Sequence, residues 1–165
     1  MDIVKLGYLA GIIDGEGSVT LNRLRQQNGK WKISARIDIT NSDCQLLSFC
    51  ASILEELTGK QVKFILTDQR ANRQVFRIQI QRRTSVVAVL DAIEPYLISK
   101  KEQARIIRQF LKIKSPYSVW TEAQAVLHAN ILNLNKIGNT HLARNDYQGA
   151  SLCRDGGIVW SAMNI

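Results

Sequence analysis

The sequence has few cysteines and prolines. Its three cysteines, Cys44, Cys50 and Cys153, form no CxxC pair and are odd in number. This argues against both a disulfide framework and a zinc site, and Cys50 falls in a helical pattern as a small buried hydrophobe. The two prolines, Pro95 and Pro116, stand where helical patterns end. The fold must therefore rest on ordinary core packing.

Long apolar runs are also missing. No stretch of about 18 consecutive apolar residues occurs, and the N-terminus lacks the basic start and apolar run of a signal peptide. These absences predict a soluble, intracellular protein without a membrane partner, in an archaeal or bacterial cytoplasm or an organelle.

Acidic residues are scarce: 14 Asp and Glu stand against 22 Lys and Arg, which gives a net charge of +8. A basic balance of this size favours a polyanionic partner. Ribosomal proteins, nucleases and membrane-surface proteins all share it, so charge alone does not choose among them. A length of 165 residues with 45% hydrophobic content fits one domain with its own core.

The first third of the chain alternates between helical and strand patterns. An apolar helix over about Leu6–Ile13 is predicted to end at Asp14–Gly17, where two glycines interrupt it. Strands follow over about Ser18–Gln26 and Trp31–Thr40, joined by the hairpin signal Asn28-Gly29. In the second strand isoleucine and alanine alternate with polar side chains, which predicts one buried and one exposed face.

The same pattern then repeats. Ser42 is the predicted N-cap of a helix that ends at Gly59, with Gln45 completing a capping box. A second hairpin has strands over about Gln61–Thr67 and Gln74–Arg82. Helices are predicted over three later ranges: Thr84–Ile93, Lys100–Ile113 and Thr121–Asn135, the last capped by Thr121 with Gln124.

The predicted order is therefore αββαββα, an α+β fold in which a four-stranded antiparallel sheet carries helices on its apolar face. We expect a single domain over residues 1–165, with a core over about 6–114. Residues 115–165 form a C-terminal extension with one helix, and the glycine- and asparagine-rich final residues have only weak periodicity.

The opposite face of the predicted sheet is polar and almost free of acids. Its residues are Thr20, Asn22, Lys32, Ser34, Arg36, Asp38, Lys63, Arg77, Gln79 and Gln81. In a generic α+β domain such a face is most often simply solvated. These residue types, however, also reach phosphates and base edges, and a two-stranded ribbon fits the major groove of B-DNA. We therefore predict that this face binds double-stranded DNA.

One nonapeptide, residues 9–17, carries the most specific signal, and it reads LAGIIDGEG. It resembles the motif that names the LAGLIDADG family of homing endonucleases, with Ile12 in place of leucine, Gly15 in place of alanine and Glu16 in place of the second aspartate. The predicted helix before it, the strand after it and the αββαββα order agree with the family's fold. The resemblance covers about residues 6–114.

The resemblance implies an intron-encoded, site-specific DNA endonuclease that acts on a long pseudo-palindromic target. In this family, chains with one motif pair their motif helices as homodimers. Small residues one turn apart allow such close approach, although packing within the chain's own core is the ordinary explanation for them. The implied dimer interface comprises Gly7, Ala10, Gly11 and Asp14, and Asp14 is expected to be structural.

The resemblance also implies the catalytic residues. Glu16 matches the family's catalytic acid, which binds Mg²⁺ (with Mn²⁺ as a substitute), and the Gly15 carbonyl matches a further metal contact. Lys100, with Lys101 as the alternative, matches a basic residue near the scissile phosphate. Asn41 and Gln45 match polar positions that organise water.

Two alternatives remain open from the sequence. One is a non-catalytic DNA-binding protein on the same scaffold, against which Glu16 and Lys100 argue. The other is an RNA-splicing maturase that binds intron RNA, alone or in addition to cleavage. His128 and His141 lack metal-ligand partners, and the sequence has no Walker loop or GxGxxG motif.

Overall fold

A computed structural model describes residues 1–25, 31–70, 73–113 and 121–140. Its contacts divide the chain into two compact units, Met1–Leu132 and Asn133–Ile165. The second unit is described only over its first residues, which complete the helix α5 (Glu122–Thr140). The boundary between the units thus falls inside α5, beyond the core boundary near residue 114 that the sequence predicts.

The first unit has the predicted αββαββα order. Its elements are α1 (Ile3–Glu16), β1 (Gly17–Arg25), β2 (Trp31–Asn41), α2 (Cys44–Thr58), β3 (Phe64–Arg70), β4 (Arg73–Ile80), α3 (Arg83–Ile93), a short 3₁₀ turn η1 (Glu94–Tyr96) and α4 (Lys101–Lys112). Among the described helices none is long and apolar enough to cross a membrane.

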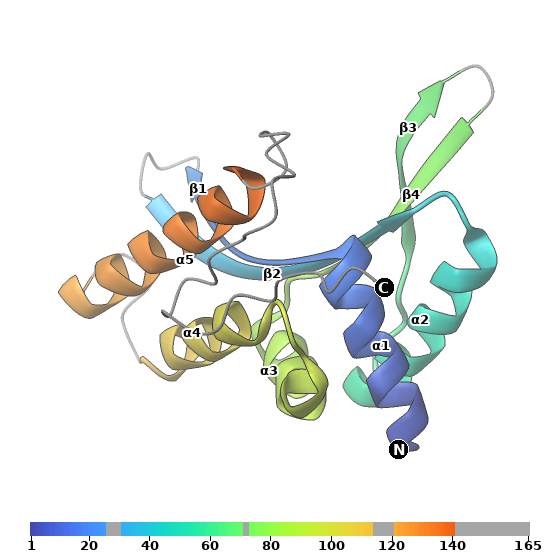
Figure 1. The fold of residues 1–165 in the computed structure, drawn as a ribbon, viewed down its shortest axis with the longest axis horizontal. Coiled ribbons are helices and arrows are strands. Elements are labelled where there is room, and N and C mark those ends of the chain that lie inside the picture. The colour runs from blue at the N-terminus through green and yellow to red at the C-terminus, as the bar shows by residue number, and fades with distance from the viewer. Residues whose placement is uncertain (26–30, 71–72, 114–120, 141–165) are drawn as a thin grey trace, which may run out of the picture. The chain divides into compact units, whose positions relative to one another are not determined.

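The strands form one antiparallel sheet in the order β1-β2-β4-β3. Helices α1 to α4 lie on one side of this sheet, and the β3–β4 hairpin projects beyond them (Figure 1). Alternate residues of β1, β2 and β4 face the helices, and these are buried: Val19, Leu21, Ala35, Ile37, Ile39, Ile78 and Ile80. The predicted apolar face is therefore confirmed, and the helices close a core against it.

The helix α1 begins at Ile3, earlier than the predicted Leu6, and it ends at Glu16, within the predicted segment Asp14–Gly17. Gly17 caps the helix and begins β1 without an intervening loop. A Cβ at Gly17 would lie 2.7 Å from Ile13 Cα and 3.1 Å from Asp38 O. Only glycine permits this close approach, which places Glu16 at the junction of helix and sheet.

The cap of α2 also differs from the prediction. Asp43, and not Ser42, is the N-cap, because its side chain accepts hydrogen bonds from the backbone N–H groups of Gln45 and Leu46 at 2.8 and 3.1 Å. Both residue types cap helices well, and the strand β2 ends late enough to make Asp43 the cap. The reciprocal bonds predicted between Thr121 and Gln124 are confirmed, each at 3.3 Å.

The second hairpin is shifted relative to the sequence-based bounds. β3 begins at Phe64 and not Gln61, and β4 ends at Ile80, so Lys63 and Gln81 each lie one residue outside a strand. The pairing also has an irregularity between Leu66 and Asp68. A bulge of this kind reverses the side-chain alternation that a periodic pattern assumes.

Candidate functional site

The C-terminal end of α1 carries two exposed residues, Gly15 and Glu16. The last carbonyl groups of a helix have no partner within the helix, and the helix dipole places partial negative charge there. Such an end favours a cation. The Glu16 carboxylate adds a full negative charge at the same place, so this end of the helix is a candidate cation site.

Asp14, near the end of the same helix, has a structural task. Its carboxylate accepts backbone hydrogen bonds from Ile98 at 2.6 Å, Lys100 at 2.9 Å and Ser99 at 3.3 Å. Burial alone would raise the pKa of Asp14, but these hydrogen bonds outweigh it, and the pKa is lowered. Asp14 thereby ties the segment before α4 to the end of α1.

These hydrogen bonds place Lys100 at the end of α1. Its ammonium group donates to the backbone oxygen of Asp14, as does the Ser99 hydroxyl at 3.4 Å. Burial lowers the pKa of Lys100, and the nearby Asp14 carboxylate partly offsets the effect. The alternative candidate Lys101 is exposed as the first residue of α4, whereas the Lys100 ammonium is held within two residues of Glu16 along α1.

We expect Asp14→Asn to destabilise the protein by about 1–3 kcal/mol, because an amide nitrogen would face backbone N–H groups that then lose their acceptor. The lowered pKa of Asp14 means that its contribution to stability is present above the pKa of the unfolded chain and disappears as the pH falls through the lower folded value. Denaturant titrations at neutral and strongly acidic pH measure this. If the wild type and the Asp14→Asn variant were equally stable at neutral pH, this prediction would be contradicted.

Asn41 and Gln45 lie at the other side of this junction. Gly17 pairs with Ile39, and Asn41 follows two residues later at the end of β2. The Asn41 side-chain oxygen accepts from the Asp43 backbone N–H at 2.9 Å, which leaves its NH₂ group to act as a donor. Gln45 is in the first turn of α2. The predicted water-organising residues are thus on segments that border the end of α1.

The polar face of the sheet begins at the same junction. Its cross-strand neighbours are Ser18 with Asp38, Thr20 with Arg36, Asn22 with Ser34, Asp38 with Gln79 and Thr40 with Arg77. Four of its polar atoms are buried and have no hydrogen-bond partner among the described residues: Thr20 Oγ1, Asn22 Nδ2, Arg77 Nε and Arg36 Nε, the last of which lies in an ion pair with Asp38. Buried polar atoms are nearly always bonded, so these atoms are suited to a polar ligand on this face.

Asp38 differs from its neighbours on this face, because it is only 5% exposed. One carboxylate oxygen accepts from Gln79 Nε2 at 3.0 Å, and the other lies 2.6 Å from Arg36 Nε and 3.5 Å from Ser18 Oγ. The contact with Arg36 is an ion pair, since Arg36 Nε makes no hydrogen bond of good geometry. The predicted direct contact of Asp38 with DNA is therefore not supported by its position.

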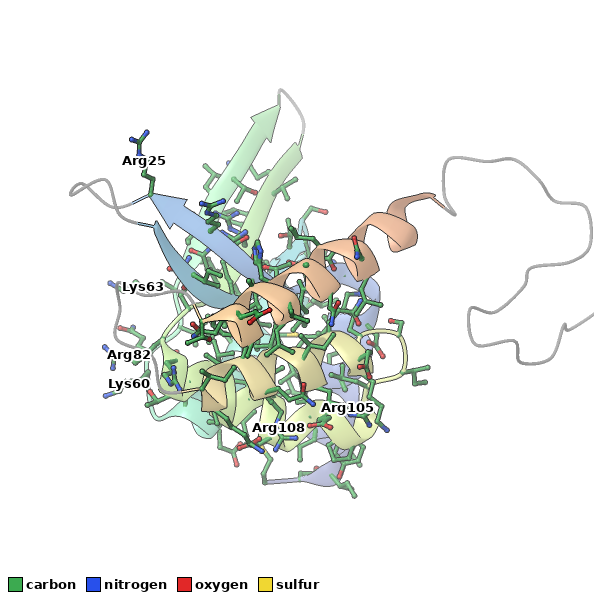
Figure 2. All side chains as sticks on the ribbon, turned by 90° about the vertical axis from the view of Figure 1, so that its left-hand side faces the viewer. Arg25, Lys60, Lys63, Arg82, Arg105 and Arg108 are labelled. Carbon is green, nitrogen blue, oxygen red and sulfur yellow. The ribbon has the colours of Figure 1, made fainter. Side chains whose placement is uncertain are left out.

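The edges of the polar face are basic. Lys63 is exposed, Gln81 is exposed at the end of β4, and the side chain of Lys32 lies outside the described residues. Lys60 and Arg82 flank the second hairpin and are also exposed, although neither was predicted from the sequence as a site residue. Figure 2 shows Lys60, Lys63 and Arg82 on one side of the molecule. The only feature of the sequence that could have indicated Lys60 and Arg82 is their position at the ends of predicted strands.

Two arginines of α4 are already paired. Arg108 makes ion pairs with Asp91, at 2.6 Å, and Glu94, and Arg105 makes one with Glu102 at 3.1 Å. These two arginines lie on α4, away from the hairpins (Figure 2). Within the described residues Lys60, Lys63 and Arg82 form no ion pair. The positive charge of these three residues is therefore not offset by an acid among the described residues.

A different surface of α1 is open. A Cβ added at Gly7, Gly11 or Gly15 would meet nothing within 4 Å. These glycines recur every fourth residue, which places them on one face of the helix. Val4 lies one turn from them in the same helix and is 72% exposed. Of the other residues expected at a dimer interface, Ala10 is fully buried in its own chain, and Asp14 holds the segment before α4.

A family model described as the LAGLIDADG-like domain matches residues 4–94 of this chain. The DNA endonuclease I-CvuI of Chlorella vulgaris is 24% identical over 137 residues, which covers 83% of this chain and 80% of that protein.

Solved structures of similar fold agree. A crystal structure of I-CvuI with its target in the presence of Ca matches with a TM-score of 0.59 and 22% identity, over 79% of this chain and 82% of that chain. A structure of the homing endonuclease I-GzeII with a DNA target matches with a TM-score of 0.57 and 16% identity, over 78% of this chain and 43% of that one. These likenesses confirm the α+β fold predicted from the sequence.

Proposed function

Because the chain belongs to the LAGLIDADG family, we propose that it is a site-specific double-strand DNA endonuclease of the homing type. It acts as a homodimer with divalent metal ions at a long pseudo-palindromic target. The observation that carries the proposal is the position of Glu16. This carboxylate stands at the end of α1, two residues after Asp14, whose backbone oxygen accepts from the Lys100 ammonium, and at the start of a polar, basic sheet face.

The residues at this helix end fit Mg²⁺. Within the described part of the chain no group of three or more His, Cys, Asp or Glu could enclose a metal ion. Mg²⁺ does not need such a cage, because it usually keeps several waters and takes one or two carboxylates plus substrate phosphates. Glu16 and the Gly15 carbonyl would hold the ion. Bound there with DNA, it would supply an activated water and neutralise charge on the phosphate.

The chain's own residues have separate tasks in the proposed reaction. Glu16 presents negative charge at a fixed place, because Gly17 allows β1 to begin directly after it. Asp14 holds the segment that carries Lys100, whose ammonium group stabilises charge on the phosphate oxygens. Asn41 and Gln45 border the site as polar groups that orient water. The Asn41 amide is oriented for this, since its oxygen is engaged by the Asp43 backbone N–H.

The sheet supplies recognition. Its polar face has buried donors and acceptors without internal partners, at Thr20, Asn22 and Arg77. Its edges have exposed lysines and arginines that form no ion pair among the described residues, which suits them to phosphate contacts that are independent of sequence. We therefore assign base reading to the centre of the face and phosphate anchoring to Lys60, Lys63 and Arg82.

A cleavage assay tests the proposal. The purified chain is incubated with DNA carrying the uninterrupted insertion site of its own gene, with Mg²⁺, Mn²⁺, Ca²⁺ or EDTA. We expect double-strand cleavage with Mg²⁺ or Mn²⁺ and binding without cleavage with Ca²⁺, whose looser coordination does not hold the reacting geometry. Binding without cleavage under every condition would instead identify a non-catalytic DNA-binding protein, and preferential binding of the intron RNA would identify a maturase.

Arg77→Ala is expected to relax base preference at one position in each half-site. Arg77 lies between Thr40 and Ile65 on the polar face, and its Nε atom lacks an internal partner among the described residues. A bidentate arginine discriminates against a wrong base by about 1–3 kcal/mol. Selection from a randomised target library measures the change. Uniform weakening on all sequences, with a salt slope lower by about one, would instead make Arg77 a phosphate anchor.

Ile78→Ala is the matched control for this change. Ile78 is the next residue of β4, but it is fully buried and faces the helices. The Ile78→Ala variant should be less stable than the wild type by about 2–5 kcal/mol, because the substitution leaves a cavity in the core. Its base preference should not change at temperatures where it stays folded.

A further inference from the structure

We propose that Asp38 sets the base preference of the enzyme without touching DNA: it holds the Gln79 amide in one orientation, ready to read an adenine. The inference rests on the proposed function and assigns a specificity-determining role within it. Asp38 is thus a positioning residue, and Gln79 is the residue that contacts the base.

The hydrogen bond between the two residues can have only one direction: Gln79 donates and Asp38 accepts. An ionised carboxylate is an acceptor without donors, whereas a glutamine amide has a donor end and an acceptor end that differ little in shape. Asp38 Oδ1 lies 3.0 Å from Gln79 Nε2. If the amide were flipped, two oxygens would face each other at that distance. The carboxylate therefore excludes the flipped amide, which most surface glutamines can adopt.

The fixed orientation leaves a defined pair of groups for DNA. One N–H of the Gln79 amide is engaged by Asp38, and the second N–H and the carbonyl oxygen remain. Adenine presents an acceptor, N7, beside a donor, N6–H₂, in the major groove, and glutamine reads this pair bidentately. A guanine presents two acceptors and cannot pair with the amide oxygen. Gln79 should therefore prefer adenine.

The surroundings of Asp38 allow an acid on a DNA-binding face. Arg36 neutralises the carboxylate from 2.6 Å, with Ser18 Oγ at 3.5 Å. These neighbours leave Asp38 only 5% exposed, so its charge would meet the phosphates only weakly.

The register also places the adenine. Asp38 pairs with Ser18, two residues after Glu16, whereas Arg25 pairs with Trp31 at the far end of the same two strands. Asp38 and Gln79 thus belong to the end of the face nearest the catalytic carboxylate. The base they specify should lie in the inner part of each half-site, close to the scissile phosphate.

The test compares base preferences of variants by selection from a pool of double-stranded DNA with a randomised target region, in Ca²⁺. The wild-type chain should select adenine at one inner position of each half-site by about 5- to 150-fold, the range of a good bidentate contact. Gln79→Ala should remove that preference. Asp38→Asn should remove most of it at the same position, because the introduced amide can accept from Gln79 or donate to it.

Glu102→Gln is the matched control, because it makes the same change of carboxylate to amide on an exposed residue of α4. Its base preferences should equal those of the wild type. Thermal unfolding of each variant shows whether it is folded during selection. If Asp38→Asn does not fold, Gln79→Ala still tests the proposal through the identity of the lost base.

Three outcomes would overturn the inference and leave the proposed function intact. They are an unchanged profile for folded Asp38→Asn, relaxation at a position different from that of Gln79→Ala, and a wild-type preference other than adenine at the Gln79 position. If the wild-type chain selects no sequence at all, the proposed function fails, and this inference fails with it.

Discussion

Glu16→Gln is expected to abolish DNA cleavage while DNA binding remains. The substitution removes the negative charge at the end of α1 with almost no change in shape. The Glu16 side chain is exposed, so neither the core nor the Asp14–Lys100 contacts depend on it. A charge-stabilising group in an active site contributes about 10²–10³-fold to the rate, and loss of a metal ligand should reach at least that range.

The measurement is double-strand cleavage in Mg²⁺ alongside binding in Ca²⁺, on the same DNA. Binding should stay within a few-fold of the wild type, because the polar sheet face is untouched. Lys100→Met provides a second arm: it keeps much of the side chain's bulk but removes the ammonium group that donates to Asp14 O. Near-normal cutting by Glu16→Gln would remove this carboxylate from the mechanism and leave the end of α1 without a catalytic role.

Gly11→Leu is expected to prevent dimerisation and, with it, cleavage of both strands, while the single chain folds normally. Nothing lies within 4 Å of a Cβ at Gly11, so the leucine has room within its own chain. Leucine also forms helix better than glycine, by about 0.8–1 kcal/mol at most. The stability of the single chain should therefore hold or rise. In a helix pair, however, the same side chain would force the backbones apart.

Analytical ultracentrifugation at micromolar concentration measures the effect, together with thermal unfolding and cleavage. Ala123→Leu is the matched control, because it adds bulk to an exposed position of α5, and it should remain dimeric. Gly11→Ala should give an intermediate loss of association. A wild-type chain that is monomeric both with and without DNA would contradict the dimer, and so would a fully dimeric Gly11→Leu.

The order of the elements was readable in the sequence, because local physics determines it. Alternation along β2 separated Ala35, Ile37 and Ile39 from the polar residues between them, and the structure buries those three. The reciprocal cap at Thr121 and Gln124 was also predicted, since both partners lie within one helical turn. The place of Glu16 came from the motif, a short segment whose resemblance is visible without tertiary contacts.

The sequence was a poorer guide to the boundaries of helices, which depend on neighbouring elements. Ser42 and Asp43 are both good N-caps, and the end of β2 decided between them. The glycines of the motif predicted that α1 ends within Asp14–Gly17, but not that Gly17 packs against Ile13 and Asp38 and begins β1 directly after Glu16. In each case the local sequence allowed more than one boundary, and the boundary is known only from the folded chain.

The arrangement of the candidate site was decided by the tertiary structure alone. Asp14 and Lys100 are separated by 86 positions in sequence, and Asp38 and Gln79 by 41, yet each pair is in hydrogen-bond contact. From the sequence, Asp38 was an acid exposed on a DNA-binding face; folded, it is covered by Arg36 and Gln79. Side-chain periodicity determines which face a residue occupies, but its hydrogen-bond partners depend on strand register, which only the pairing of distant segments establishes.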